Sequence, residues 1–435
     1  MRASLQVLTG LLRTPAGRRK IVSAWNYASF PLLWPLAALY RRLLARRMRI
    51  VTIVGSVGKT TTRSAVATAL GVPHRHGDAR NAWSEVVWTL FEVPLSAPRA
   101  VLEVGIAKPG QMRWYARMLR PQIAVVTAIA SDHNRSLPSL EVTRTEKADM
   151  VRALAADGLA VLNGDDANVL WMRTQTRARV VTVGFGADND VRAEDWAVEW
   201  PRGSRFTVRI GARSWAVRTR FIGRHHVFPF LAALAVADAE GVDMEAAVAA
   251  LSALEPVAGR MDVIPLASGA WILADDFKAP QESYQAAFDT LESLAGHRRL
   301  VVLGAVNEPA GGQSRLYREL GTRAGRVASR ALLLGGGKVR DAMAKAAVHA
   351  GMRAEDVTVS AEMNVLEAAA WLEKQLVAGD VLLVKGRTEQ RLRRIVLKLR
   401  GRAVRCDIPV CNVNDLTCDQ CPMLERGWQG LRPVT

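Results

Sequence analysis

Residues 49–62 read Arg-Ile-Val-Thr-Ile-Val-Gly-Ser-Val-Gly-Lys-Thr-Thr-Thr. The apolar run 49–54 predicts a short buried strand, and residues 60–70 predict the helix that follows it. A tight glycine-containing turn between a strand and a helix N-terminus brings backbone N–H groups and the positive end of the helix dipole together. This stretch therefore predicts an α/β fold organised around an anion-binding loop.

The residue types in the loop indicate which anion it binds. Gly55 and Gly58 let backbone amides converge on phosphate oxygens. Lys59 can reach the terminal phosphates, and the Thr60 hydroxyl can ligate Mg²⁺. Ile53 occupies the position where the general phosphate-loop pattern has its first glycine. The loop predicts a nucleoside triphosphate site and does not by itself identify a reaction.

Further strands and helices alternate on both sides of residue 255. Residues 180–222 alternate apolar and polar side chains and predict a small antiparallel insert, whereas 226–251 is Ala-rich and predicts helix. A last helix is expected over 389–399, with Leu392, Ile395, Val396 and Leu399 on one face and its arginines on the other. Buried parallel strands are expected at 101–104, 123–128, 159–162, 271–274, 300–303, 331–334 and 381–384.

Composition and charge narrow the class of protein. The chain has 435 residues, 49% hydrophobic and 23% charged, which is typical of a globular protein with more than one domain. The net charge is +18; residues 1–50 carry ten basic and no acidic residues, and residues 385–405 carry nine basic and one acidic residue. These two segments account for the whole excess of basic over acidic residues, and such clusters could bind a membrane surface or a polyanionic substrate. No nucleic-acid-binding module accompanies the charge, so no nucleic acid partner is expected.

The first fifty residues form a separate basic and aromatic segment. Residues 21–40 are apolar and lie between basic clusters, but Pro31 and Pro35 are expected to interrupt a helix there. Three readings stay open: an interfacial or re-entrant anchor, a helical pair packed on the protein's own surface, and a membrane span. No cleavable signal peptide is evident, so a cytoplasmic location is expected, peripheral at the inner face of the membrane if the segment is an anchor.

All four cysteines lie near the C-terminal end of the sequence, as Cys406, Cys411, Cys418 and Cys421. This clustering excludes a distributed disulfide framework. Four thiolates at this spacing can hold a tetrahedral Zn²⁺, an iron–sulfur cluster uses the same ligands, and reduced or redox-active thiols are the third alternative.

Several ordered segments resemble the Mur ligase family. They comprise Gly55–Thr62, Val101-Leu-Glu-Val-Gly105, Arg120–Thr127, His133, Glu146-Lys147, Leu162–Asp166, Gly223-Arg-His225, Pro256–Arg260, Asp275-Asp276, Val301–Glu308 and Leu383-Val-Lys-Gly386. The central part is most similar to the branch that adds D-Ala-D-Ala. The resemblance implies a central phosphate-loop ATPase domain (49–255) and a Rossmann-like C-terminal ligase domain (256–403), which follow the basic and aromatic helical N-terminal segment (1–48). A tail that holds the four cysteines follows (404–435).

The resemblance also implies site residues. Lys59, Lys147, Arg260 and Lys278 are expected to act in catalysis, with Lys147 carbamylated and Arg260 directed at the γ-phosphate. Magnesium is expected at Thr60, Glu103, His133 and Lys147. The zinc, or alternatively iron–sulfur, expected at the four cysteines rests on their spacing and not on the resemblance. The nucleotide contacts expected are Gly55, Gly58, Lys59, Thr60, Thr61, Asn163, Asp166 and Asp276.

The function implied is ATP-dependent formation of an amide bond between a carboxylate acceptor and an amine or amino acid, through an acyl phosphate. Only about fifty residues precede the loop, and Lys385-Gly-Arg-Thr388 lacks a Ser-Arg pair expected in the D-Ala-D-Ala branch. We therefore expect a non-UDP acceptor in envelope polymer or specialised peptide synthesis. Similarity to membrane-associated poly-γ-glutamate synthases is one alternative. A non-catalytic ATP-binding scaffold is the other, because His226 and Pro229 replace two family asparagines.

Overall fold

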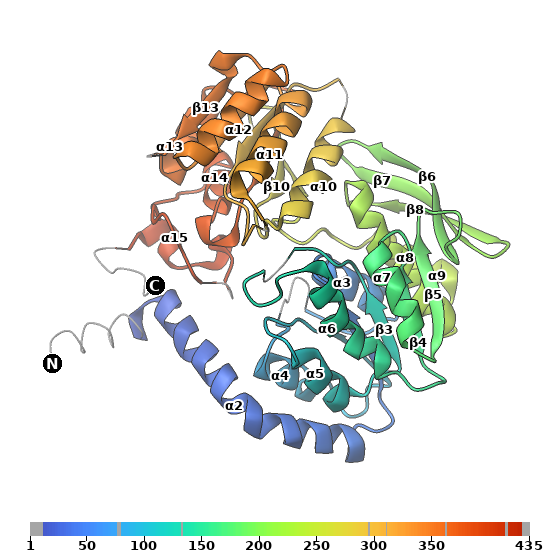
Figure 1. Cartoon of the computed structure of the whole chain (residues 1–435). Helices are drawn as coiled ribbons and strands as arrows, with labels where there is room; N and C mark the ends of the chain where they lie inside the picture. Colours follow the sequence, from blue (N-terminus) through green and yellow to red (C-terminus); the bar gives the residue numbers. More distant parts are fainter. Residues whose placement is uncertain are drawn as a thin grey trace, which may run out of the picture. The chain divides into compact units, whose positions relative to one another are not determined.

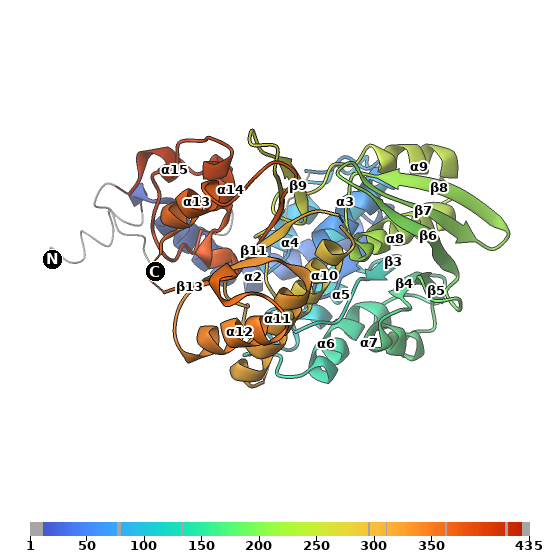
Figure 2. The same cartoon turned by 90° about the horizontal axis from the view of Figure 1, so that it is seen from above.

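The computed structural model describes residues 12–75, 80–131, 134–294, 296–309, 311–361, 363–413 and 416–428. These residues fall into two compact units: those of Asn26–Val257 form one, and those of Met1–Trp25 and Ala258–Thr435 form the other. Each unit has a mixed sheet that is mostly parallel, with helices packed on it (Figures 1 and 2). The predicted α/β class is confirmed.

The unit Asn26–Val257 is built on a sheet with strand order β2-β1-β3-β4-β5-β6-β7-β8. Neighbours from β2 to β6 pair in parallel, and β6, β7 and β8 pair antiparallel. The predicted antiparallel insert is therefore present and extends the sheet at the end opposite β2. The strands are β1 (Arg49–Val54), β2 (Arg99–Glu103), β3 (Ile123–Val126), β4 (Leu159–Asn163), β5 (Arg179–Gly184), β6 (Val191–Glu199), β7 (Gly203–Ile210) and β8 (Arg213–Thr219).

Helices cover both faces of this sheet because its strands are apolar on both sides. Val51 and Ile53 of β1 join the core under α3, α8 and α9, whereas Ile50 and Val54 join the core under α2, α4, α5 and α6. The predicted helix 226–251 is divided into α8 and α9. The helices are α2 (Pro15–Leu43), α3 (Lys59–Ala69), α4 (Ser84–Phe91), α5 (Gln111–Leu119), α6 (Leu140–Arg152), α7 (Ala167–Leu170), α8 (Val227–Ala239) and α9 (Met244–Ser252).

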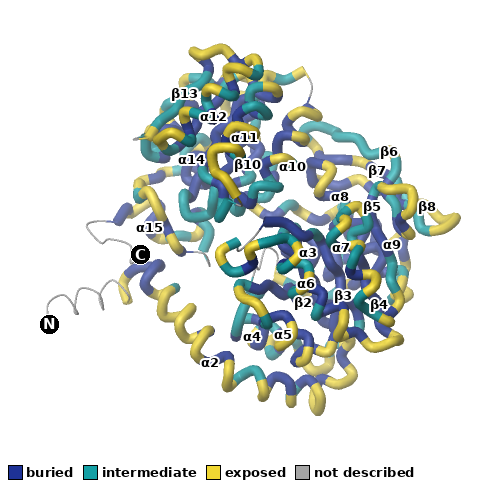
Figure 3. Tube along the Cα trace, in the orientation of Figure 1, coloured by how far each residue is buried: buried dark blue, intermediate teal, exposed yellow. Residues whose placement is uncertain are grey.

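Helix α2 is continuous, so the expectation that Pro31 and Pro35 interrupt it is wrong. Both prolines are exposed, and water can bond to the carbonyls that lose their helical N–H partner. Phe30, Ala37 and Ala38 lie on one face of α2 and are buried in the core of the unit Asn26–Val257, while much of the other face of α2 is exposed (Figure 3). Within the described residues, no helix combines the length and apolarity needed to cross a bilayer.

The other unit has the strand order β13-β12-β11-β14-β10-β9, parallel except for the antiparallel edge strand β9. Strands β9 and β13 were not predicted, since they lie at the edges of the sheet and lack the run of buried apolar residues that marked the central strands. The elements are β9 (Asp262–Pro265), β10 (Trp271–Asp275), α10 (Gln281–Glu292), β11 (Arg299–Leu303), α11 (Gln313–Val327), β12 (Arg330–Leu334), α12 (Lys338–His349), β13 (Val357–Ser360), α13 (Val365–Glu373), β14 (Val381–Lys385), α14 (Arg393–Leu399) and α15 (Met423–Arg426).

Candidate active site

The loop between β1 and α3 lies at the carboxyl end of the parallel strands, between neighbours β2 and β3 that continue the sheet in opposite directions. Open α/β sheets bind ligands at such a switch point. Ser56 N donates to Ala128 O at 2.7 Å, which ties the loop to the residues after β3. Gly58, with a φ of 80°, precedes the first residue of α3, Lys59. The structure thus gives this loop the strand–turn–helix setting that phosphate binding needs.

Gly55 is required by close packing as well as by its backbone conformation. Its φ is 147°, and a Cβ atom there would stand 1.9 Å from Thr127 Oγ1. Thr127 in turn donates from Oγ1 to Val57 O at 2.6 Å. Any side chain at residue 55 would displace Thr127 and the loop that it holds.

Two lysines predicted for the site meet at this loop. Lys59 and Lys147 are both buried. Lys59 Nζ donates to Ser56 O at 3.1 Å, and Lys147 Nζ donates to Gly55 O at 2.6 Å. Helix α6 therefore delivers Lys147 to the phosphate loop across 92 residues of sequence, whereas its neighbour Glu146 accepts from Gly110 N.

Glu103 brings a carboxylate to the same edge of the sheet. It is the last residue of β2 and pairs with Ile53 of β1, two residues before Gly55. Its Oε1 accepts from Asn81 Nδ2 at 2.6 Å, while its buried Oε2 has no hydrogen-bond partner among the described residues. A buried carboxylate oxygen without a partner is costly unless a cation or donor joins it. Glu103 is therefore suited to ligate a divalent cation.

The remaining predicted residues of this unit differ in what they contact. Thr60 and Thr61 are buried in the first turn of α3. Asn163 Nδ2 donates to Thr127 O at 2.9 Å, and Asp166 accepts from Ile129 N at 2.8 Å while capping α7. These contacts of Asn163 and Asp166 are with the backbone, and they fix the loop after β3. His133 lies outside the described residues.

The unit Ala258–Thr435 places a second polar cluster at the carboxyl ends of β10 and β14. Lys385 is fully buried and pairs with Asp275, with 2.5 Å between Nζ and Oδ2. Lys385 also donates to the backbone carbonyl of Lys278 at 3.3 Å. Burial raises the pKa of Asp276 to about 6; the positive charge of Arg393 opposes this shift, and the negative charge of Asp275 adds to it.

Arg260 and Asp276 lie near each other within this unit. The Arg260 guanidinium stacks 4.7 Å from the ring centre of Phe277, the residue that follows Asp276. A Cβ atom on the neighbouring Gly259 would lie 3.2 Å from Asp276 Oδ1, an oxygen without a hydrogen-bond partner in the described part of the chain. Arg260, Asp276 and Lys278 are thus gathered around the end of β10, as their spacing along the sequence allows.

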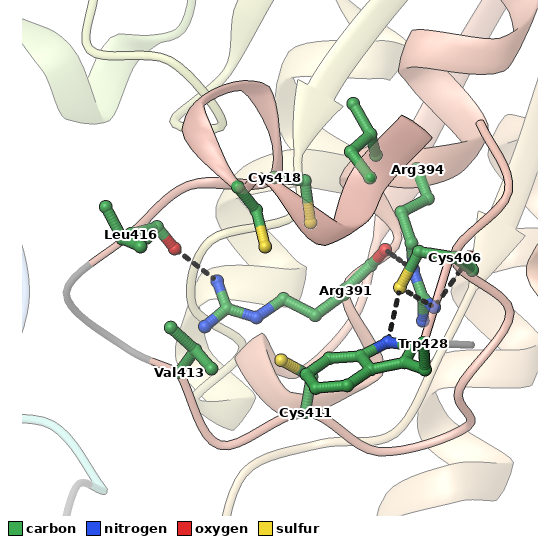
Figure 4. Close-up of a pocket in the computed structure, with 10 residues that line it drawn as sticks. Arg391, Arg394, Cys406, Cys411, Val413, Leu416, Cys418 and Trp428 are labelled. Atoms are coloured by element: carbon green, nitrogen blue, oxygen red, sulfur yellow. Dashed lines mark hydrogen bonds between the residues drawn. The ribbon is translucent and has the colours of Figure 1, made fainter. Parts of the chain in front are cut away.

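The four cysteines line one cavity together with Arg391, Arg394 and Trp428 (Figure 4). The expectation that arginines of the last helix face outward is wrong: Arg393 and Arg394 are buried, because the tail folds over them. Among the described residues, no group of three or more His, Cys, Asp or Glu side chains could hold a metal ion, so the expectation of zinc or iron–sulfur at the four cysteines finds no support here. Burial raises the pKa of the Cys418 thiol to about 12.

Comparison with known proteins identifies the family. Residues 53–237 match the Mur ligase middle domain, and residues 259–388 match the Mur ligase glutamate ligase domain. The UDP-N-acetylmuramoyl-tripeptide–D-alanyl-D-alanine ligase of Mycobacterium tuberculosis strain H37Rv is 30% identical over 368 residues, covering 80% of this chain and 72% of that protein.

The chain belongs to the Mur ligase family.

Two further Mur ligases show how far the similarity extends. The protein of the same name from Bacillus subtilis is 28% identical over 293 residues, and the match spans 62% of its length. The crystal structure of the MurF ligase from Thermotoga maritima in complex with ADP has a TM-score of 0.75 at 19% identity, covering 86% of this chain and 84% of that one. The latter likeness concerns the fold. Mur ligases are ATP-dependent amide-forming ligases that use Mg²⁺, so the coarse prediction of enzyme class is confirmed.

Three residues were not predicted from the sequence, two of them at the phosphate loop and one in the polar cluster at the ends of β10 and β14. Thr127 and Lys385 stand in segments that resemble the Mur ligases, yet their contacts with the loop and with Asp275 depend on neighbouring strands. Asn81 carries no sequence signal, because only the fold brings it to Glu103.

Proposed function

We propose that this Mur ligase is an ADP-forming enzyme that joins the carboxylate of an acceptor to an amine through an acyl phosphate. The convergence of Lys59, Lys147 and Glu103 around Gly55 carries the proposal. The buried cation of Lys59 suits transfer of a phosphoryl group whose charge must be neutralised, and the buried carboxylate of Glu103, with Lys147 once carbamylated, suits the metal ion that assists it.

The reaction needs positioning more than covalent participation of side chains. A carboxylate oxygen of the acceptor attacks the γ-phosphorus of ATP, and the bond to the bridging oxygen breaks so that ADP leaves. The amine then attacks the acyl carbon and loses a proton, and inorganic phosphate departs. Lys59 neutralises negative charge on the transferring group, and the loop amides orient the phosphates.

The residues at the loop fit magnesium, the family's metal ion. The Oε2 of Glu103, which no donor among the described residues reaches, and the buried Thr60 at the start of α3 are oxygen ligands of the type that Mg²⁺ prefers. Once bound, Mg²⁺ withdraws charge from the phosphate oxygens. Lys147 would join this site as a carbamate, and His133 would complete it, as the resemblance implies. Arg260, Lys278 and Asp276 keep their proposed roles at the γ-phosphate, the acyl group and the ribose.

The acceptor proposed is not a UDP-linked muramoyl peptide. The segment Lys385-Gly-Arg-Thr388 supports this proposal, because it lacks the Ser-Arg pair expected of the D-Ala-D-Ala branch. The UDP-N-acetylmuramoyl tripeptide named for the related ligases is the first acceptor to test against this proposal.

Phosphate release from ATP across a panel of acyl acceptors and amino acids tests the activity. We expect release only when a matched acceptor and amine are both present, and Lys59→Ala should abolish it. Release with a UDP-muramoyl tripeptide and D-Ala-D-Ala would refute the non-UDP acceptor, and release with glutamyl chains would favour the poly-γ-glutamate alternative. ATP binding without release for any pair would favour the scaffold.

We further propose that α2 places this ligase on an anionic membrane surface. Leu32, Leu36, Leu39 and Leu43 recur at helical spacing on its exposed side, where their exposed fractions are 74%, 58%, 53% and 62%. A water-facing helix side is normally polar. The exposed Arg42, Arg46 and Arg47 follow this stripe. Exposed leucines beside arginines are typical of a helix that lies at the surface of an anionic membrane. Each basic residue near such a surface contributes about 1 kcal/mol to the free energy of membrane binding.

Co-flotation of the full chain with phosphatidylglycerol vesicles tests this placement. We expect binding to these vesicles and little to phosphatidylcholine vesicles. Leu36→Glu should lower the membrane partition coefficient by about tenfold or more, because burying one leucine is worth about 1.5–3 kcal/mol and about 1.4 kcal/mol is a factor of ten. Val377→Glu is the matched control, since Val377 is 57% exposed but lies after α13. Equal loss in both variants, or no binding by the unaltered chain, would refute the placement.

A further inference from the structure

Residues 81–84, which lead into α4, contact both the end of β2 and helix α2. The first of them, Asn81, donates from Nδ2 to Glu103 Oε1 at 2.6 Å. The backbone carbonyl of Asn81 accepts from Gly105 N at 2.7 Å, so Asn81 is tied to the end of β2 by its backbone as well. A Cβ atom on Gly105 would stand 2.7 Å from Asn81 Oδ1. The carboxamide of Asn81 therefore lies directly against the chain that follows Glu103.

Trp83, two residues after Asn81, has a backbone conformation that its surroundings must hold. Its φ is 51°, in the left-handed region that bulky side chains rarely adopt. Such a conformation persists only where neighbouring groups fix it. One of these groups is the hydroxyl of Tyr115, a fully buried residue of α5, which accepts from Trp83 N at 2.6 Å.

Helix α2 supplies further contacts that fix these residues. The Tyr27 ring meets the Trp83 ring edge-on, with 4.9 Å between the ring centres, and the Phe30 ring does the same at 5.6 Å. Between these two aromatic residues of α2, Ser29 Oγ lies 2.9 Å from Ser84 Oγ, and both serines are buried. Edge-to-face ring pairs and buried hydrogen bonds depend on direction, so together they hold residues 81–84 in one position.

We propose that Asn81 is a positioning residue for the magnesium ligand Glu103, and that α2 keeps Asn81 in place through Trp83. This inference rests on the metal site proposed above at Glu103. The Asn81 amide holds Oε1 and leaves Oε2 as the carboxylate oxygen for the cation. A ligand held in one orientation binds a metal ion more tightly than one that rotates freely. The contacts between α2 and Trp83 therefore affect metal affinity, although no residue of α2 is a proposed ligand.

Binding of Mn²⁺ to the full chain tests the inference without turnover. The free ion is measured by its EPR signal in the presence of a non-hydrolysable ATP analogue. Asn81→Ala should weaken Mn²⁺ binding by about tenfold or more, because it frees the carboxylate of a metal ligand. Tyr27→Ala leaves the hydrogen bond to Glu103 in place and removes one ring from Trp83. It should weaken Mn²⁺ binding by about two- to tenfold.

Trp34→Phe is the matched control for Tyr27→Ala. It removes the hydrogen bond from Trp34 Nε1 to Trp114 O, which joins α2 to α5 instead of to residues 81–84. We expect it to leave Mn²⁺ binding unchanged. Thermal unfolding of each variant is measured alongside, because a purely structural role would lower the unfolding temperature without changing the affinity for Mn²⁺.

The Glu103→Gln variant separates this inference from the metal site on which it rests. If Glu103→Gln weakens Mn²⁺ binding and Asn81→Ala does not, the metal site stands and the positioning role of Asn81 is wrong. Equal effects of Tyr27→Ala and Trp34→Phe would refute the part played by α2 through Trp83. Unchanged Mn²⁺ binding in Glu103→Gln would overturn the metal site and the inference together.

Discussion

Asp276 gives the unit Ala258–Thr435 a pH-dependent stability that can be calculated. Burial raises the pKa of this carboxyl from 3.8 to about 6. Below about pH 4 the group is protonated in the folded and the unfolded chain, whereas above about pH 6 the folded chain must hold it ionised. The free energy of unfolding therefore falls as the pH rises between these values.

The size of the effect follows from the shift. A change of about two pH units corresponds to about 3 kcal/mol of unfolding free energy. Asp276→Asn removes the charge while keeping the shape of the side chain. The difference in unfolding free energy between this variant and the unaltered chain should therefore shift by about 3 kcal/mol in favour of the variant between about pH 4 and about pH 8.

Amide hydrogen exchange of peptides covering β10 and β14 measures this stability in the full chain at both pH values. Glu373→Gln is the matched control, since it removes an exposed carboxylate at the end of α13 and should leave the pH dependence unchanged. An Asp276→Asn chain with the same pH dependence as the unaltered one would refute a buried, destabilised carboxylate at this position.

Three other predictions concern the phosphate loop. Lys59→Ala should lower kcat/KM for ATP on the order of a hundredfold or more, because a buried cation at the transferring phosphate is lost; unchanged turnover would contradict its role. Glu103→Gln should raise the Mg²⁺ concentration needed for half-maximal turnover by about tenfold or more, measured by Mg²⁺ titration, and an unaltered titration would remove Glu103 from the metal site. Gly55→Ala should lower the thermal unfolding temperature by more than Gly71→Ala does. Both glycines have a positive φ, but only at residue 55 would the added Cβ clash, with Thr127 Oγ1. Equal effects of the two substitutions would count against that contact.

The sequence alone determined the fold class, the family and the core of the nucleotide site. The run 49–62 carries strand, glycines, lysine and helix start within fourteen residues, so local pattern was enough to locate it. Glu103 and Lys147 were named from the resemblance, and their places at the loop follow from parallel strand register and from the packing of α6. The edge strands β9 and β13 were missed because their residues are mostly half-buried and give no apolar run, unlike the equally short but fully buried β3.

Only the tertiary structure decided how distant segments complete each cluster. Asn81 donates a hydrogen bond to Glu103, and Lys385 forms an ion pair with Asp275. Arg394 is buried, although the helix pattern predicted that it faces water. Such contacts depend on which strands become neighbours and on how the tail folds back, and neither is encoded in local spacing. The exposed leucines of α2 are a further case: an apolar sequence predicts burial, and the fold leaves one side of that helix without a neighbour among the described residues to bury it.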